Sequence, residues 1–472
     1  MAEFPVLAVG AGPVGLTAAL LLARLGVPVH VVERHPEPYP LPRAVHLDDE
    51  VFRVLQAAGV AEDVARISRP MAGLQVLDQR LRVLADFARD LDQQPNGWPL
   101  GSLFHQPDLE AVLRAAVLAE PRIRLEEGAE LTGLRQDDDG VDAEVSGTSL
   151  RAQFVLGCDG ANSTVRRLTG AAMRGLGPTD RWLVVDARAR FGNRVWPGVH
   201  QVSDPDRAAT FMPVTGDRYR WEFRLRPDES AAELASPARL AELIAPFGAV
   251  DVEVLRAAEY VFRAQVADRW RTGRVLLAGD AAHLTPPFIG QALGLGLRDA
   301  HQLAWKLARV LDGRAGPSLL DTYQAEREPH ARALIRIALL LGAIMTRGGR
   351  GGAAVRGGLL QVARRLPAVA RLATDSSTPP LRPGPLVDPR RPAGTLLPQP
   401  SVSVGGRRCR LDDVLGPREA ELAIDGAGRL SVHLEDGERV RVDDGGVLVD
   451  WLRRAGARRA VVRPDRIVRS VR

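Results

Sequence analysis

The feature that most constrains the fold of this chain is a glycine-rich turn, G-x-G-x-x-G, at residues 10–15. It follows an apolar run at residues 4–9 that we expect to be a buried strand. It opens an apolar stretch at residues 13–25 that suits a buried helix. Residues 27–32 predict a second buried strand. A strand, a helix and a second strand in this order are typical of the start of a doubly wound α/β fold.

The glycines of this turn have separate physical roles in binding a dinucleotide. Gly10 permits the tight turn, Gly12 lets the backbone approach a pyrophosphate, and Gly15 lets the helix pack on the strand. Pro13 stands at the start of the helix and is included in the predicted cofactor site. A glycine turn without a ligand is the alternative interpretation.

The end of the second predicted strand indicates which dinucleotide binds. Glu33 stands there, about 20 residues after the glycine turn, which is the separation that a dinucleotide site requires. Its carboxylate can accept hydrogen bonds from both ribose hydroxyls of an adenosine, and we include the neighbouring Arg34 in the predicted site. Because a carboxylate repels a 2′-phosphate, NADP is disfavoured here, and FAD or NAD remains.

A second motif points to FAD rather than NAD. Gly279-Asp280 follows a predicted buried strand at residues 275–278, and a helix is expected to begin near Leu293. Asp280 could bind a ribityl hydroxyl, a group that NAD lacks, although an aspartate there could also be only a helix cap. The N-terminus of the helix would stabilise the negative charge of a reduced flavin ring.

Composition argues against several other classes of protein. The net charge is +5, but the basic residues are interleaved with 58 acidic ones, so no nucleic-acid partner is expected. No run reaches the roughly 20 apolar residues that span a bilayer, and the N-terminus shows no signal-peptide pattern. Cys158 and Cys409 are the only cysteines and have no metal-ligand spacing. We therefore expect no metal site, no membrane partner, and a reducing, cytoplasmic location.

The chain divides into five predicted segments. Residues 181–270 alternate polar and apolar residues and hold four of the seven tryptophans, which favours an antiparallel sheet inserted into the α/β domain. Residues 375–404 carry eight prolines, which is typical of an extended linker. The predicted boundaries are 1–180 and 271–374 for a Rossmann-like FAD-binding domain, 181–270 for a substrate-binding sheet, 375–404 for the linker and 405–472 for a small C-terminal domain.

A turn at residues 158–166 supplies the third motif, in which Asp159 would lie near the path of a pyrophosphate or nicotinamide. With three motifs in this order and spacing, the chain resembles the class A flavoprotein aromatic hydroxylases, the para-hydroxybenzoate hydroxylase superfamily. Shorter matches at residues 42–50, 104–110 and 220–223 resemble the 3-(3-hydroxyphenyl)propionate hydroxylase branch. That branch also includes hydroxylases that act on polyketide-derived rings.

The resemblance carries functional roles onto individual residues. Arg43 would bind the FAD phosphates and Gln106 would contact the cofactor, although a surface arginine and a helix-capping glutamine are the alternatives. Asp159 would serve both FAD and NADPH. The residues implied to line the flavin ring are Pro287, Gly290, Gln291, Ala292 and Leu293. The family often has glycine at position 292 and asparagine or cysteine at position 294, so Ala292 and Gly294 are departures from its pattern.

The resemblance also implies an activity, that of an FAD-dependent monooxygenase. NADPH or NADH would reduce the flavin, O2 would add to it as a C4a-hydroperoxide, and one oxygen would pass to a phenolic or polycyclic aromatic substrate. The alternatives are dehydrogenation, epoxidation or Baeyer–Villiger-type oxygenation in secondary metabolism, and a flavin-binding sensor without turnover. We expect a monomer or a homodimer.

The substrate side of the site and the C-terminal domain are predicted less directly. His46 and Asp48 follow Arg43 and are the candidates for a catalytic role. The tail is similar to the thioredoxin-like domain of the branch but lacks a C-x-x-C pair, so dithiol chemistry is not expected. Aromatic and methionine residues at alternate strand positions could roof the pocket, although they are more often core. Those candidates are Phe211, Met212, Tyr219 and Trp221.

Overall fold

A six-stranded sheet forms the base of the N-terminal part of the computed structural model, which describes residues 3–38, 44–346 and 378–472. Its order is β20-β21-β12-β1-β2-β8, and every neighbouring pair is parallel except β20 with β21. The strands are β1 (Val6–Val9), β2 (Val29–Glu33), β8 (Ile123–Glu127), β12 (Phe154–Gly157), β20 (Arg271–Thr272) and β21 (Val275–Leu277). The predicted Rossmann-like α/β FAD-binding fold is confirmed.

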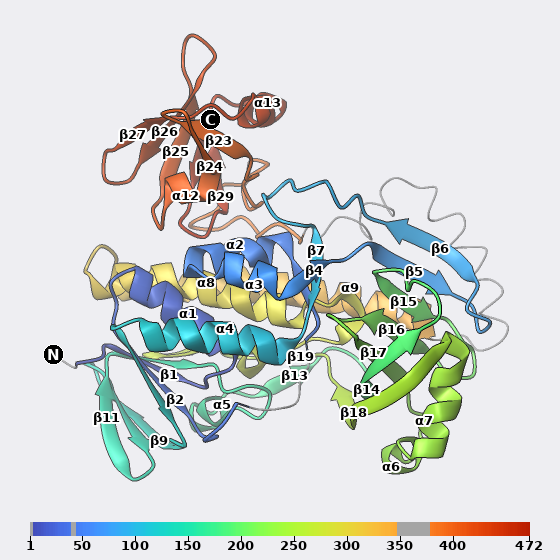
Figure 1. Cartoon of the computed structure of the whole chain (residues 1–472). Coiled ribbons are helices and arrows are strands. Elements are labelled where there is room, and N and C mark those ends of the chain that lie inside the picture. Colours follow the sequence, from blue (N-terminus) through green and yellow to red (C-terminus); the bar gives the residue numbers. More distant parts are fainter. Residues whose placement is uncertain (1–2, 39–43, 347–377) are drawn as a thin grey trace.

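Helices cover one face of this sheet and a small sheet covers the other. Figure 1 shows α1, α4 and α8 above β1 and β2, with β9 and β11 below them. The helices are α1 (Pro13–Arg24), α4 (Gln106–Ala119) and α8 (Ala292–Leu311), and the antiparallel strands are β9 (Leu131–Gln136), β10 (Val141–Val145) and β11 (Thr148–Ala152). Because β1 and β12 are buried on both faces, they appear in the sequence as continuous apolar runs.

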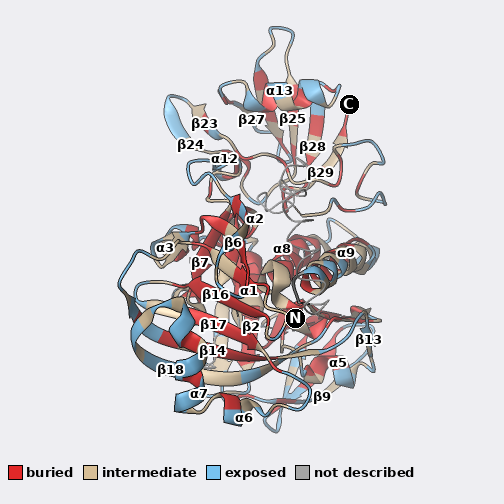
Figure 2. Cartoon of the chain, turned by 90° about the vertical axis from the view of Figure 1, so that its right-hand side faces the viewer, coloured by how far each residue is buried: buried red, intermediate tan, exposed pale blue. Residues whose placement is uncertain are grey.

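A seven-stranded sheet stands beside this core, in the order β18-β14-β17-β16-β15-β5-β6. Its strands are β5 (Gly73–Leu77), β6 (Val83–Ala88), β14 (Asp180–Phe191), β15 (Val199–Val202), β16 (Ala209–Pro213), β17 (Arg218–Arg224) and β18 (Ala249–Phe262). All pairs are antiparallel except β15 with β5. The sheet therefore takes two strands, β5 and β6, from the segment that the sequence assigned to the FAD-binding domain. Figure 2 shows that β16 and β17 are mostly buried, whereas β18 has no buried residue.

Shorter strands and further helices complete this part of the chain. The remaining strands of this part are β3 (His46–Asp48), β4 (Ser68–Pro70), β7 (Gly101–Phe104), β13 (Met173–Gly175), β19 (Gln265–Ala267) and β22 (His283–Leu284). The remaining helices are α2 (Asp49–Ala58), α3 (Ala61–Arg66), α5 (Thr164–Leu168), α6 (Ala231–Leu234), α7 (Pro237–Ile244) and α9 (Asp321–Thr346). Across the described part of the chain, no helix is both long and apolar enough to cross a membrane.

The C-terminal residues form a second domain with its own hydrophobic core. Its elements are β23 (Ser401–Val404), β24 (Arg407–Arg410), α12 (Leu411–Leu415), β25 (Ala420–Ile424), β26 (Leu430–Leu434), β27 (Arg439–Arg441), α13 (Val447–Arg454), β28 (Arg459–Val462) and β29 (Val468–Val471). The five-stranded sheet β27-β26-β25-β28-β29 is antiparallel at every described pair. A thioredoxin-like fold contains a parallel β-α-β unit, so this detail of the prediction is not confirmed.

The proline-rich segment is packed rather than free. From residue 378 to the start of β23 it contains no helix or strand, as expected for an extended chain. However, Leu381, Val387 and Leu397 are buried, and Leu396 forms a bridge with Ile467. The prediction of a simple linker is therefore corrected, because apolar residues between the prolines anchor the segment on the C-terminal domain.

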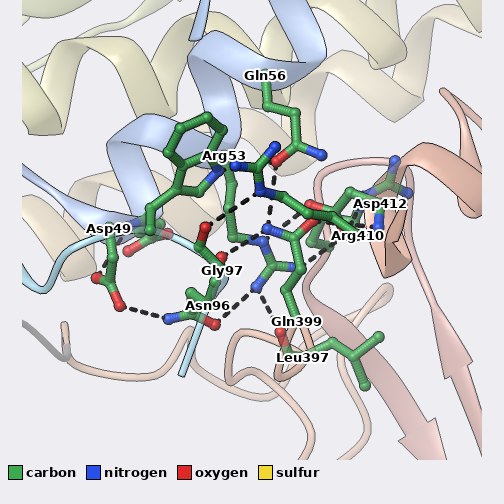
Figure 3. Close-up of polar contacts among 12 residues, drawn as sticks. Asp49, Arg53, Gln56, Asn96, Gly97, Leu397, Gln399, Arg410 and Asp412 are labelled. Carbon is green, nitrogen blue, oxygen red and sulfur yellow. Dashed lines mark hydrogen bonds and ion pairs between the residues drawn. The ribbon is translucent and has the colours of Figure 1, made fainter. Parts of the chain in front are cut away.

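One buried arginine of α2 joins the two domains (Figure 3). Arg53 is 2% exposed, and its Nε and Nη2 donate to the Asp412 carboxylate at 2.8 and 2.9 Å. Its Nη1 donates to the Asn96 side-chain oxygen at 3.1 Å. Beside it, the Arg410 guanidinium lies 3.7 Å from the centre of the Trp98 ring. These contacts fix the C-terminal domain on α2, the helix that directly follows β3.

Candidate active site

A cavity of about 1600 Å³ lies between the six-stranded and seven-stranded sheets. One end is lined by the glycine turn and by Glu33 and Arg34 at the end of β2, and the other by residues of β14, β16, β17 and β18. The N-terminus of α8 lines the region between them. Cavities for one drug-sized ligand measure about 300–1,000 Å³, so this space suits a large cofactor together with a second molecule.

The structure supports the separate roles predicted for the three glycines. Gly10 has φ +104°, and a Cβ there would lie 2.6 Å from the Cys158 carbonyl oxygen. A Cβ on Gly15 would lie 2.0 Å from the Gly10 carbonyl oxygen, so α1 packs directly on the turn. A Cβ on Gly12 would meet no atom within 4 Å, and Gly12 and Pro13 both line the cavity. Only the middle glycine therefore faces open space, as a backbone that approaches a phosphate requires.

Glu33 both shapes the turn and faces the cavity. The Ala11 backbone N–H donates to its Oε2 at 2.8 Å, and the His35 N–H donates to its Oε1 at 3.0 Å. A carboxylate has about four lone-pair sites, so each oxygen keeps capacity for a ribose hydroxyl. The geometry is compatible with the adenosine contact that the sequence predicts.

Gln106 and Arg114 line the cavity from α4. The Ala44 N–H donates to Gln106 Oε1 at 2.8 Å, and Gln106 Nε2 donates to Glu110 at 2.8 Å. Arg114 forms an ion pair with Glu127 and was missed by sequence reasoning. The signal that could have found it is its position two helical turns after Gln106 on the same face. The predicted phosphate-binding Arg43 lies outside the described residues.

Asp159 lines the cavity, but its carboxylate also holds its own turn together. The Ser163 hydroxyl donates to its Oδ1 at 2.5 Å, and the N–H groups of Thr164 and Val165 donate to its Oδ2 at 2.6 and 3.0 Å. Asp159 thus caps α5 and fixes the loop beside the glycine turn. Its proposed contact with FAD and NADPH stays a prediction.

The predicted flavin-facing turn forms a continuous part of the cavity wall. Its lining residues are Asp280, Pro287, Gly290, Gln291, Ala292 and Leu293. α8 begins at Ala292, and no side chain caps it. Gln291 cannot do so because its amide donates to Asp48 at 2.8 Å and accepts from Arg298 at 2.9 Å. The first N–H groups and the positive end of the helix dipole are therefore available to a ligand.

The departure at position 294 has a packing reason. A Cβ on Gly294 would lie 2.8 Å from Arg298 Nη1 and 3.0 Å from a methyl carbon of Val51. A larger residue would displace the arginine that orients Gln291. Gly294 therefore leaves the room that Arg298 needs beside the turn.

The two residues predicted as catalytic have different positions. His46 lines the cavity, and its Nδ1 lies 3.4 Å from the Gly290 carbonyl oxygen. Burial, together with Arg89, lowers the pKa of His46 to about 4, so it is neutral at pH 7. Asp48 does not line the cavity among the described residues, and this prediction is corrected. It is 2% exposed and accepts from Arg298 at 2.6 Å and from the Val51 N–H at 2.8 Å.

Asp48 is therefore a positioning residue. Burial alone would raise the pKa of Asp48, but the Arg298 guanidinium, together with the Val51 N–H and His46, holds that pKa below its usual value. Arg298 also pairs with Glu50 at 2.7 Å, so the start of α2 and the start of α8 are tied together. Sequence reasoning placed Asp48 near the flavin by its distance along the chain, and could not show that a partner would bury it.

The prediction for the seven-stranded sheet is also corrected, since only Met212 of its four candidates lines the cavity. Phe211 and Trp221 lie on the opposite face, with ring centres 5.1 Å apart, and Phe247 packs 5.2 Å from Phe211. Tyr219 is on that face too, with its ring centre 6.0 Å from Phe211. Strand residues alternate between faces, so the cavity instead receives residues that sequence reasoning missed. These are Thr210, Arg220 and Glu222.

Comparisons with known proteins agree with this geometry. A family model described as "FAD binding domain" matches residues 3–338. The chain is 37% identical over 438 residues to the 3-(3-hydroxy-phenyl)propionate/3-hydroxycinnamic acid hydroxylase of Mycobacterium avium (strain 104), over 87% of this chain and 75% of that protein. A solved ternary complex of aklavinone-11 hydroxylase with FAD and aklavinone superposes with a TM-score of 0.81 at 28% identity, over 100% of this chain and 95% of that one.

A second solved structure extends the same result. The anhydrotetracycline hydroxylase OxyS from Streptomyces rimosus has a TM-score of 0.77 at 28% identity, over 99% of this chain and 95% of that one. The family match spans most of the chain and includes the glycine turn, Asp159 and Asp280. The chain belongs to the FAD-binding-domain family, and it is a flavin-dependent aromatic monooxygenase.

Proposed function

We propose that this monooxygenase hydroxylates a phenolic ring of polycyclic size in secondary metabolism, with FAD, NADPH or NADH, and O2. The observation that carries the proposal is the continuous cavity of about 1600 Å³, which reaches from the glycine turn to the seven-stranded sheet. The similarity to hydroxylases named for aklavinone and anhydrotetracycline supports a substrate larger than a single ring. Antibiotic biosynthesis is the corresponding setting.

The residues at the cofactor end fit FAD. Gly12 leaves room for a pyrophosphate, Glu33 retains acceptor capacity for a ribose, and Asp280 lines the middle of the cavity, where a ribityl chain would lie. The uncapped start of α8 would stabilise negative charge on a reduced ring. When bound and reduced, FAD supplies an activated oxygen atom from O2.

The chain itself contributes binding, orientation and exclusion of water. Leu334 and Ile337 of α9 and Phe87 of β6 form apolar parts of the wall. An apolar wall excludes water from the reacting oxygen atom and strengthens the electrostatic interactions inside the cavity. The neutral His46, beside Gly290, can donate or accept a hydrogen bond near the ring without adding charge.

The test is NADPH and NADH oxidation by the FAD-loaded chain, with and without phenolic acids, naphthols and polycyclic quinols. We expect one class of compound to accelerate oxidation manyfold and to gain one oxygen atom by mass spectrometry. A product that has lost two hydrogens would instead indicate dehydrogenation. Bound FAD that neither nicotinamide reduces would refute the monooxygenase and favour a sensor.

Two finer predictions accompany this proposal. We propose that the enzyme works as a monomer or a homodimer on a small aromatic molecule. A cytoplasmic location stays a prediction that rests on the cysteine content, with Cys158 and Cys409 both unpaired. Size-exclusion chromatography with light scattering would determine the oligomeric state.

A further inference from the structure

Glu222 is a buried carboxyl on the cavity face of β17. It is 8% exposed and lines the cavity. Its strand neighbours are Val184 on β14 and Thr210 on β16, neither of which is charged. No residue in the described parts of the chain donates a hydrogen bond to its side chain, and Arg220 and Asp186 affect it only through their charges.

Three neighbouring polar side chains on this face, by contrast, have partners within the sheet. Arg220 Nε and Nη2 donate to the Asp186 carboxylate at 2.7 and 3.1 Å. The Thr210 hydroxyl donates to Gln201 Oε1 at 3.1 Å, and Gln201 Nε2 donates to the Ala209 carbonyl at 3.0 Å. The Glu222 carboxyl lines the cavity and takes no part in these contacts, so its oxygens are available to a bound molecule.

Glu222 also lies at the correct end of the cavity for the reaction. Strand register pairs Val184 with Glu222 and Trp182 with Arg224, so Trp182 is the diagonal neighbour of Glu222 on the same face. The Trp182 ring centre lies 5.9 Å from that of Phe288, in the turn that precedes α8. Glu222 is therefore near the predicted flavin-ring turn and not near the adenosine end.

The chemistry of this position favours a proton acceptor. Burial raises the pKa of Glu222, Arg220 partly opposes that rise, and Asp186 adds to it. A carboxylate with a raised pKa is a stronger base, and a phenol is a weak acid. A phenolic hydroxyl would supply the hydrogen bond that the buried carboxylate lacks.

We propose that Glu222 is a catalytic residue that accepts the hydrogen bond, and then the proton, of a phenolic hydroxyl on the substrate. The O–H bond breaks, its electron pair stays on the phenolic oxygen, and a new O–H bond forms on the carboxyl. The proton returns to the phenolic oxygen after the ring has taken up the oxygen atom. The electron-rich ring is then a better nucleophile. This proposal rests on the proposed function and defines the substrate class as phenols.

Binding of a matched pair of probes tests the acceptor role without turnover. The FAD-loaded full chain is titrated with 2-naphthol and with 2-methoxynaphthalene, which lacks the hydroxyl proton, and binding is followed by flavin absorbance. A hydrogen bond to a charged group predicts a preference for the naphthol of about 10-fold to 100-fold. Glu222→Leu should abolish the preference, whereas Glu253→Gln, an exposed carboxylate on β18 of the same sheet, should keep it.

Glu222→Gln separates hydrogen bonding from proton transfer. The amide oxygen can still accept a hydrogen bond but cannot take the proton, so naphthol should bind while kcat for hydroxylation falls at least about 100-fold. Equal probe preference in wild type and Glu222→Leu, or wild-type kcat in Glu222→Gln, overturns the role of Glu222. If wild type prefers naphthol but yields no oxygenated product, the proposed function fails while the acceptor role stands.

Discussion

The ion pair between Arg53 and Asp412 should contribute several kcal/mol to the contact between the two domains. Both side chains are buried, at 2% and 7% exposure, and share two hydrogen bonds of 2.8 and 2.9 Å. Breaking a buried pair costs about 3–5 kcal/mol, because one charge is left without compensation. Arg53→Met should destabilise the protein by about 3 kcal/mol, because Asp412 keeps its ion pair with Arg466 at 3.2 Å. Asp412→Leu leaves two buried guanidinium groups and should approach about 5 kcal/mol.

A double-mutant cycle measures this interaction directly. Urea unfolding followed by tryptophan fluorescence gives the free energy of unfolding of wild type, both single variants and the double variant. The double variant should be more stable than the sum of the single effects predicts, by about 1.5–3 kcal/mol. Arg418→Met is the control, because Arg418 pairs with Asp436 and Glu438 at the surface and should cost less than about 1 kcal/mol. Single variants within about 1 kcal/mol of wild type, or strictly additive effects, would refute the reasoning.

Three further predictions follow from buried groups and from the glycine turn. Burial, together with the nearby Asp48, raises the pKa of Asp49 to about 7. Protonated Asp49 therefore stabilises the folded state fully below the unfolded pKa of about 4, and this contribution to the free energy of unfolding is lost as the pH rises to about 7. Relative to wild type, the free energy of unfolding of Asp49→Asn should therefore rise by about 2 kcal/mol between pH 5 and pH 8, as measured by thermal unfolding. A difference between variant and wild type that does not change with pH would contradict this. Gly12→Ala should leave thermal stability unchanged but weaken FAD binding about tenfold or more, whereas Gly15→Ala should lower the yield of folded protein. If the two variants behave alike in FAD titrations and melting curves, the roles assigned to the two glycines are wrong. Lys306, the only lysine, is fully buried, and burial lowers its pKa to about 8, so an amine-reactive reagent should modify it only after denaturation, as peptide mass spectrometry can check.

The corrections at the site have two physical origins. Asp48, Phe211, Tyr219 and Trp221 were predicted from their distance along the chain and from residue type. Burial by Arg298 removes Asp48 from the cavity, and the alternation of strand residues turns the three aromatic side chains toward α7 and away from it. An alternating pattern shows that a strand has two faces, but not which of them a ligand will meet.

The α/β class, the glycine turn, the FAD motifs and the resemblance to aromatic hydroxylases could all be predicted from the sequence, because each depends on local spacing along the chain. Tertiary structure decided what depends on segments far apart. β5 and β6 join the inserted sheet, Arg53 and Asp412 meet across 359 positions, and Glu222 faces the cavity without a partner. Burial and pairing at such positions depend on the packing of the whole chain, and the spacing of residues in one segment does not contain that information.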